Sequence, residues 1–203
     1  MTLLRALSLC AGLIAASAPG NAHEIYVSNE KDNTVSVIDS TKLEVVRTFK
    51  VGKRPRGITF SADAKHLFVC ASDDDAVQVY DETGSTLLHN LPSGADPEQF
   101  ALSNSGKRLY IANEDNAVTT VVDVETRQVV AQVDVGVEPE GMAVSPDDTL
   151  IVATSETTNM AHLIDGKTHA VVANVLVDQR PRHAEFTPDG KKVIAGNLDG
   201  EIK

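Results

Sequence analysis

Four charged tetrads, identically spaced, hold the side chains of this sequence that are best suited to chemistry. Each tetrad contains a proline, and the four prolines are 42 residues apart: Pro55, Pro97, Pro139 and Pro181. The residues beside them are basic, acidic, acidic and basic in turn: Arg54 and Arg56, Asp96 and Glu98, Glu138 and Glu140, Arg180 and Arg182. Guanidinium groups present a planar fork of donors to a carboxylate or phosphate, whereas the acidic pairs suit a cation or a basic protein. The alternative is that neighbouring tetrads of opposite sign form salt bridges with each other.

The sequence contains none of the common catalytic motifs. Gly-x-Ser-x-Gly, Cys-x-x-Cys-His, His-Glu-x-x-His and a phosphate-binding loop are all absent. Cys70 lies in an apolar run, Phe68–Ala71. A small buried side chain is a simpler interpretation of this cysteine than a nucleophile. Acidic loops recur, but they lack the ligand spacing and the glycine of a calcium loop. We therefore predict no catalytic residue, no cofactor and no metal site, and a protein that is not an enzyme.

The elements that position the tetrads are short strands. Each 42-residue unit contains alternating or apolar runs separated by Ser, Asn, Asp and Gly, which is typical of antiparallel strands joined by tight turns. In the third complete copy of the pattern, for example, Met142–Val144 and Leu150–Ala153 flank the turn residues 145–148. Four strands per unit of this length predict a blade of a β-propeller. The fold class is therefore all-β, a β-propeller of four-stranded antiparallel blades.

A column of aspartates repeats in the same register, at the end of the third strand of each unit. Their regular recurrence favours a structural role, because an active site is needed only once, and we expect each carboxylate to accept hydrogen bonds from turn amides. The column consists of Asp39, Asp81, Asp123 and Asp165.

The repeats resemble a known family. Tyr26-Val27-Ser28-Asn29 and Tyr110-Ile111-Ala112-Asn113 look like the Tyr-Val-Thr-Asn motif of YVTN-type β-propeller repeats, and residues 139–147 match the flanking Pro-x-Gly element. The resemblance implies a bacterial periplasmic or surface propeller. Such repeats are similar to the haem-binding propeller of cytochrome-type nitrite reductases and to propellers encoded beside quinoprotein alcohol dehydrogenases.

In propellers of this kind, the loop that enters the first strand of a blade lies at one rim of the central channel. The four tetrads would therefore line one rim. His183 follows the last tetrad and stands where Gly57 and Gly141 stand in other units, with Gln99 as the other departure. The haem-binding relatives imply a haem or metal ligand at this position. A lone histidine beside Arg182 is also an ordinary polar loop residue, since a metal site needs several ligands.

Residues 1–22 differ from the repeats. Arg5 precedes an apolar stretch, Ala6–Ala18, that is too short to span a bilayer, and Gly20-Asn21-Ala22 offers small residues for cleavage. These features predict a secretory signal peptide cleaved after Ala22, a periplasmic location, and no membrane insertion after cleavage. Leu9 before Cys10 argues against a lipoprotein site.

The repeats form units at about residues 24–52, 53–94, 95–136 and 137–178, with a partial unit at 179–203 that holds strands at 184–187 and 192–196. This pattern favours an incomplete, open arc of about four blades, as in the front part of a longer propeller. Two alternatives remain: self-association of two arcs through open blade edges, because exposed sheet edges invite pairing, and a four-bladed ring with one blade built from both ends.

The formal net charge of −11 argues against nucleic acid and anionic membrane surfaces as partners. We therefore expect a periplasmic binding or interaction scaffold that is an accessory to a quinoprotein or other periplasmic redox system and whose partner is another periplasmic protein or a small ligand. The alternative hypothesis is a cofactor-bearing propeller, haem-linked or lactonase-like, with its site at the channel mouth.

Overall fold

Each 42-residue unit folds as a sheet because its apolar and polar residues alternate along short segments that end at turn formers. In the computed structural model, which describes residues 23–198, the strands of a unit pair in sequence order. The pairing is antiparallel, for example between β9 (Arg108–Asn113) and β10 (Val118–Asp123), where Arg108 is opposite Asp123 and Asn113 is opposite Val118. Each unit is therefore one blade.

Five sheets succeed one another along the described residues. The first contains β1 (Glu24–Asn29), β2 (Thr34–Asp39) and β3 (Glu44–Lys50). The second contains β4 (Pro55–Phe60), β5 (His66–Ala71), β6 (Ala76–Asp81) and β7 (Leu87–Pro92), with a short 3-10 turn, η1 (Ser72–Asp74), between β5 and β6. The third contains β8 (Pro97–Leu102), β9, β10 and β11 (Gln128–Asp134). The fourth contains β12 (Pro139–Val144), β13 (Leu150–Ser155), β14 (Met160–Asp165) and β15 (Val171–Leu176), and the fifth contains β16 (Pro181–Phe186) and β17 (Val193–Asn197).

The predicted all-β fold and the four-stranded blades are confirmed. In the last unit β16 begins earlier than the alternation alone predicts, because Pro181 and His183 already pair with Asn197 and Gly196 of β17. The predicted signal peptide lies outside the described residues. Among residues 23–198, the structure contains no helix with the length and apolarity needed to cross a membrane.

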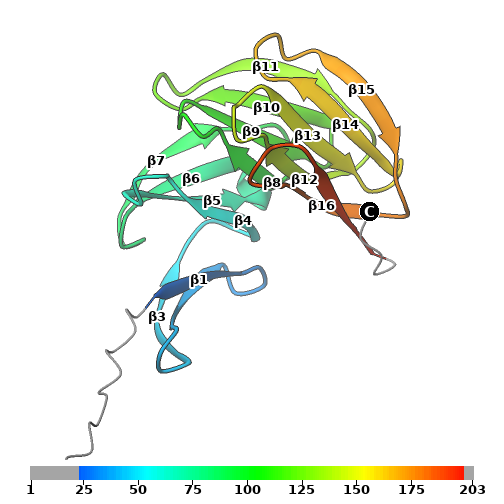
Figure 1. Cartoon of the computed structure of the whole chain (residues 1–203). Coiled ribbons are helices and arrows are strands. Elements are labelled where there is room, and N and C mark those ends of the chain that lie inside the picture. The colour runs from blue at the N-terminus through cyan, green and yellow to red at the C-terminus, as the bar shows by residue number, and fades with distance from the viewer. Residues whose placement is uncertain (1–22, 199–203) are drawn as a thin grey trace, which may run out of the picture.

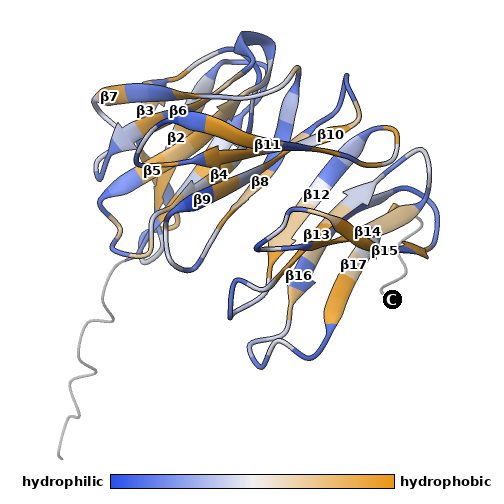
Figure 2. Ribbon diagram, turned by 90° about the horizontal axis from the view of Figure 1, so that it is seen from above, coloured by the Kyte–Doolittle hydropathy of each residue, from blue (hydrophilic) through white to orange (hydrophobic). Residues whose placement is uncertain are grey.

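Apolar side chains between neighbouring blades form the core. Between the second and third blades, Phe68 and Leu91 pack against Phe100, Leu109 and Ile111, all of them buried. Equivalent clusters lie between the first and second blades and between the third and fourth. Figure 1 shows the blades succeeding one another as a fan, with the sheet of β1–β3 at one end and β16 beside β12, and Figure 2 shows hydrophobic stretches on the strands of each blade. The described residues therefore form an open arc of about four blades.

The third-strand aspartates accept hydrogen bonds from turn amides, as predicted. Asp39 Oδ1 accepts from the N–H groups of Thr41 and Lys42 at 2.9 and 3.0 Å, and Asp165 makes the equivalent bonds to Lys167 and Thr168. A further bond from the Thr41 hydroxyl, together with these amides, lowers the pKa of Asp39. The column therefore stabilises the turns between the third and fourth strands.

Cys70 is fully buried between the second and third blades, as predicted, and burial raises the pKa of its thiol. A thiol held neutral in an apolar core is a poor nucleophile. Its role here is packing.

Candidate functional site

The tetrads lie at the start of each inner strand, and their backbone is fixed by the neighbouring loops. The second residue of every tetrad adopts a left-handed conformation, with φ between 50° and 57°, at Arg54, Asp96, Glu138 and Arg180. The carbonyl of each of these residues accepts a bond from the loop after the second strand of its own blade, as in Ser72 N–H to Arg54 O at 3.2 Å. This brings the tetrads and those loops together at one end of the inner strands, the channel mouth.

The loop of the preceding blade also holds the tetrad backbone. The N–H groups of Arg54, Asp96 and Arg180 donate to side-chain oxygens of the preceding blade at 2.8–3.0 Å. The accepting residues are Asn33, Asp75 and Asn159, all of them left-handed. The equivalent residue before Glu138 is Ala117, which is also left-handed, with φ 55°, but has no side-chain oxygen.

Replacing Ala117 with asparagine is therefore expected to stabilise the protein by about 1 kcal/mol, because asparagine tolerates the left-handed conformation and would accept from the Glu138 N–H. Urea denaturation measures the change. Ala64→Asn is the matched control, since Ala64 is left-handed too, with φ 57°, but lies in an exposed turn away from the tetrads. An equal gain in both variants would show that the missing hydrogen bond at Ala117 contributes nothing.

The first two tetrads are joined by ion pairs between blades. Arg54 contacts both carboxylate oxygens of Asp96 at 3.1 Å, and its Nη2 lies 2.5 Å from Glu98 Oε1. Arg56 also pairs with Glu98, and it lies 3.2 Å from Glu30 and 3.8 Å from Glu140. Two guanidinium groups of one blade thus surround a carboxylate of the next, the cross-blade arrangement that the salt-bridge alternative expects.

The last two tetrads are joined through a residue that the sequence did not single out. Glu156, in the loop after β13, pairs with both Arg180 and Arg182. Arg182 also lies 3.6 Å from Glu140, which connects this pair of blades to Arg56. Seven of the nine predicted site residues therefore belong to one group of ion pairs at the channel mouth, and His183 follows Arg182 on β16. Glu138 also lies at the channel mouth but makes none of these ion pairs: its carboxylate accepts from the Thr157 hydroxyl and its carbonyl from the Glu156 N–H.

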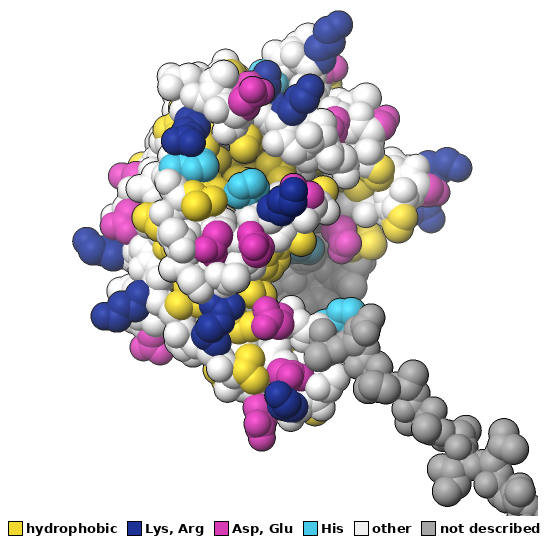
Figure 3. Space-filling view, turned by 90° about the vertical axis from the view of Figure 1, so that its left-hand side faces the viewer, with side chains coloured by type: hydrophobic (Ala, Val, Ile, Leu, Met, Phe, Trp, Pro, Cys, Tyr) yellow, Lys and Arg dark blue, Asp and Glu magenta, His cyan; other side chains and the backbone are white. Residues whose placement is uncertain are grey.

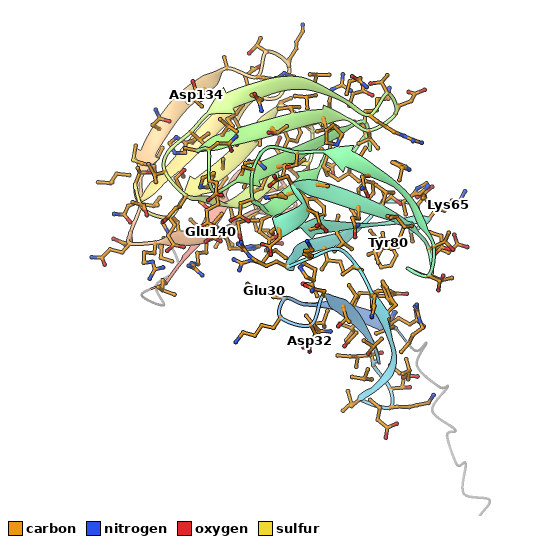
Figure 4. All side chains as sticks on the ribbon, turned by 180° about the vertical axis from the view of Figure 1, so that it is seen from behind. Glu30, Asp32, Lys65, Tyr80, Asp134 and Glu140 are labelled. Carbon is orange, nitrogen blue, oxygen red and sulfur yellow. The ribbon has the colours of Figure 1, made fainter. Side chains whose placement is uncertain are left out.

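Other acidic residues of the channel mouth come from the loops between second and third strands. Arg54 lies 3.6 Å from Glu30, 3.5 Å from Asp73 and 3.8 Å from Glu114. The sequence shows these loops to be acidic, but turn propensity explains Asp and Glu there equally well. Their spacing in the chain gave no indication that they face the tetrads. Figure 4 shows Glu30 and Glu140 on one side of the molecule and Lys65, in a turn between first and second strands, on the other.

Two carboxylates of the channel mouth are buried. The Glu98 side chain is about 1% exposed, and Glu140 is also buried. Burial raises the pKa of both, and it outweighs the opposing attraction of Arg56 for Glu98. The hydrogen bond to Glu156 raises the pKa of Glu140 further. Burial acts to raise the pKa of Glu156 as well, but the bonds from Arg182 and Arg180 outweigh it, so the pKa of Glu156 is lowered. Such perturbed groups are typical of functional sites and of structural ion-pair networks alike.

The raised pKa of Glu140 predicts a pH dependence of stability. The folded protein keeps this proton at pH values where the unfolded chain has lost it, so the stabilisation is present at low pH and disappears as the pH rises through the folded-state pKa. We expect the free energy of unfolding to fall by about 3 kcal/mol between about pH 4 and pH 7 because of this group, and Glu140→Gln to remove that part of the fall. Denaturation at stepped pH tests this, and parallel curves for the two proteins would contradict it.

Three carboxylates of the channel mouth, those of Asp96, Glu98 and Glu114, have ligand oxygens within 4.8 Å of one another. Arg54 approaches all three at 2.5–3.8 Å. The guanidinium therefore already supplies the positive charge that a metal ion would bring, and these contacts alone assign no metal to the cluster.

His183 lies on the inner strand β16 and is exposed, and its position is explained by packing between blades. A Cβ added at Gly141 would meet the Cα and N of His183 at 2.8 and 2.9 Å, and one added at Gly57 would meet Gln99 Oε1 at 2.9 Å. Glycine thus alternates with a larger residue at this column because successive inner strands approach closely. Among the described histidines only His183 lies on an inner strand, whereas both ring nitrogens of His162 are engaged, by Gly136 N–H and Asn174.

Comparison with known proteins identifies a family for this fold. The model of the family described as cytochrome D1 heme domain matches residues 62–183. Among solved structures, the chain is similar to hydrazine synthase of Kuenenia stuttgartiensis, with a TM-score of 0.77 and 23% identity over 85% of this chain and 51% of that chain. The chain thus spans about half the length of that protein chain, and at this identity the likeness shows the fold alone. No curated protein matches the sequence.

The family description names a haem, and the described residues do not by themselves fit one. A cavity of about 370 Å³ runs along the inner strands, but residues at the end opposite the tetrads line it, such as Phe60, Leu102 and Val144, and His183 does not. The arginines of the channel mouth that could hold haem carboxylates are paired with Glu98, Glu140 and Glu156. No chemical step is therefore assigned to a haem.

The matched segment covers more than half of the 203 residues and spans the blades whose tetrads build the channel mouth. The fold observed over those residues is the β-propeller arrangement that the repeats predict. The chain belongs to the cytochrome D1 haem domain family.

Proposed function

We propose that this protein is a non-enzymatic periplasmic scaffold that binds a charged partner at the channel mouth, as an accessory to a quinoprotein or other periplasmic redox system. One observation supports this above the others: charged side chains from all five sheets of the described residues and from their loops gather at one end of the inner strands. Four arginines, Arg54, Arg56, Arg180 and Arg182, face seven carboxylates, Glu30, Asp73, Asp96, Glu98, Glu114, Glu140 and Glu156.

The excess of carboxylates favours a basic partner. The arginines are largely neutralised within the molecule, whereas Glu30 and Asp73 stay about half exposed. Exposed charge of one sign steers a partner of the opposite sign and selects against like-charged surfaces. A periplasmic protein with a basic patch is therefore the partner that this surface fits best.

The location and the redox association rest on the sequence. The signal-peptide pattern of residues 1–22 supports export, and the YVTN-type resemblance supports a bacterial periplasmic propeller of the kind found near quinoprotein alcohol dehydrogenases. The acidic composition disfavours nucleic acid, and on the face shown in Figure 3 basic and acidic side chains are interspersed rather than gathered by sign.

Neutralising the exposed carboxylates tests the proposal. We expect Glu30→Gln combined with Asp73→Asn to lose a protein that the wild type captures from periplasmic extract, because the change removes negative charge without disturbing buried Glu98. The control, Glu44→Gln with Glu82→Gln, changes net charge equally at exposed positions near the turns between third and fourth strands. If the wild type and both double variants retain the same proteins, the proposal is wrong.

A haem-bearing channel is the second candidate, favoured by the family match and by the place of His183 on an inner strand. It requires groups beyond the described residues, since those present do not enclose a haem. The absorption spectrum of the protein purified from its own periplasm decides between the two. A Soret band that disappears in His183→Ala would favour the haem, and its absence from the wild type would exclude this candidate.

A further inference from the structure

The internal repeat allows the contacts at one junction between blades to be compared with those at the next. At the junction of the second and third blades, the guanidinium group of Arg54 lies among carboxylates of both blades. It approaches four of them at 2.5–3.8 Å: Asp73, Asp96, Glu98 and Glu114. This junction therefore shows which carboxylate positions of the repeat hold a guanidinium group.

The junction of the third and fourth blades repeats the carboxylates but not the arginine. The residues 42 positions further along the chain, called here the second acidic set, are Asp115, Glu138, Glu140 and Glu156. Asp96 stands at the position of Arg54, in the same left-handed conformation, and its own carboxylate pairs with Arg54 of the preceding blade. The second acidic set therefore has no arginine from the third blade.

The fifth sheet neutralises the second acidic set only in part. Arg180 and Arg182 both pair with Glu156. The Glu140 side chain is 8% exposed, yet the nearest guanidinium nitrogens, those of Arg182 and Arg56, are 3.6 and 3.8 Å away, beyond hydrogen-bond distance. This buried carboxyl group can therefore still accept a hydrogen bond from a further cation.

The other two members of the set lie nearer the solvent. Asp115 is exposed and Glu138 is half-buried. Within residues 23–198 neither forms an ion pair with a lysine or arginine, whereas their counterparts Asp73 and Asp96 both contact Arg54. A cation can thus reach the buried Glu140 from the solvent past two carboxylates that have no cation of their own.

We propose that the second acidic set binds the guanidinium group of an arginine side chain of the partner protein, between the third and fourth blades, as the preceding junction holds Arg54. Arginine fits better than lysine, because its planar fork of donors reaches several carboxylates at once, whereas an ammonium group is a compact point charge. This arginine is the group through which the basic partner of the proposed function binds, so the assignment rests on that function.

Two amidated pentapeptides, Gly-Gly-Arg-Gly-Gly and Gly-Gly-Lys-Gly-Gly, are the probes, titrated into the full chain and followed by NMR. We expect saturable shifts of the amide signals of Glu138 and Glu156, with the arginine peptide binding about threefold more tightly or better. Asp115→Asn with Glu138→Gln should weaken the arginine peptide about fivefold, because two exposed charges that face the guanidinium group are removed. The control, Glu44→Gln with Glu82→Gln, changes the net charge equally and should bind like the wild type.

Asp96→Arg gives a second test, in which the site is filled instead of discharged. Arg54 has φ 50° and Asp96 has φ 51°, so the backbone at this position accepts an arginine, whose side chain is expected to occupy the second acidic set and block the peptide. Absence of saturable shifts, equal binding of the two peptides, or unchanged affinity in the Asp115 and Glu138 double variant would overturn the proposal.

Two further outcomes separate the alternatives. If calcium chloride produces the same shifts at a lower concentration than the arginine peptide does, the second acidic set is a metal site and the proposal is overturned. Capture of a partner from periplasmic extract, with its dependence on Glu30 and Asp73, is measured independently. Intact capture without peptide binding would reject the arginine site alone, and peptide binding without capture would reject the proposed function alone.

Discussion

Replacing Arg54 and Arg56 together with glutamine is expected to lower the free energy of unfolding by about 1–3 kcal/mol, because it removes the two guanidinium groups that pair with the buried carboxyl group of Glu98. Glu98 is about 1% exposed, and these two guanidinium groups are the cations in contact with it. Burial already raises the pKa of Glu98, so without the two arginines its carboxyl group takes up a proton, and the cost is that of the lost hydrogen bonds to a buried group. The expected loss is therefore larger than for surface ion pairs such as Lys42 with Asp39.

Urea denaturation at neutral pH measures this loss, and a triple variant separates charge from packing. Adding Glu98→Gln to the double variant should restore part of the stability, because an amide offers both donors and acceptors to the two introduced glutamines. If the triple variant is as unstable as the double, the arginines stabilise the channel mouth through packing of their side chains and not through their pairing with Glu98.

The second large effect concerns the contacts between blades. Ile151→Ala is expected to cost about 2–5 kcal/mol, since Ile151 is fully buried between the third and fourth blades. Ile25 occupies the equivalent position in the first blade but is 47% exposed, because no blade precedes it among the described residues. Ile25→Ala is therefore expected to cost about 1 kcal/mol or less.

The two variants form a matched pair, with the same residue type at the same column of the repeat. Chemical denaturation of both proteins gives the difference, and a loss for Ile25→Ala as large as that for Ile151→Ala would contradict the open arrangement. It would indicate that another segment or a second molecule covers the first blade in solution.

The fold could be predicted because its information lies in the periodicity of the chain. Columns such as Asp39, Asp81, Asp123 and Asp165 keep one register, so each unit must place them at the same turn, and the structure gives them the predicted hydrogen bonds. The burial of Cys70 follows in the same way from its place in an apolar strand.

The pairing at the channel mouth could be predicted only in part. The opposite signs of neighbouring basic and acidic tetrads suggested salt bridges between blades, but not that Glu98 and Glu140 are buried while the carboxylate of Glu138 contacts Thr157. Glu156 was missed because an acidic residue in a turn has an ordinary local explanation. Which carboxylate reaches which arginine depends on the angle between blades, and a linear sequence does not contain that angle.

The sequence alone could not explain the alternation of Gly57, Gln99, Gly141 and His183 either. In the sequence, His183 is a departure from glycine and invites interpretation as a ligand. In the structure, the close approach of β12 and β16 accounts for Gly141 opposite His183. The distance between inner strands decides this point, and it becomes visible only once the blades are assembled.

The most direct test of the proposed function is the affinity between this protein and the partner it captures, measured at low and high salt. The account predicts that Glu30→Gln with Asp73→Asn weakens binding about tenfold, that Glu44→Gln with Glu82→Gln has no effect, and that added salt weakens the wild type most. Equal affinity for all three proteins, with no dependence on salt, would contradict the claim that the acidic channel mouth is the binding surface.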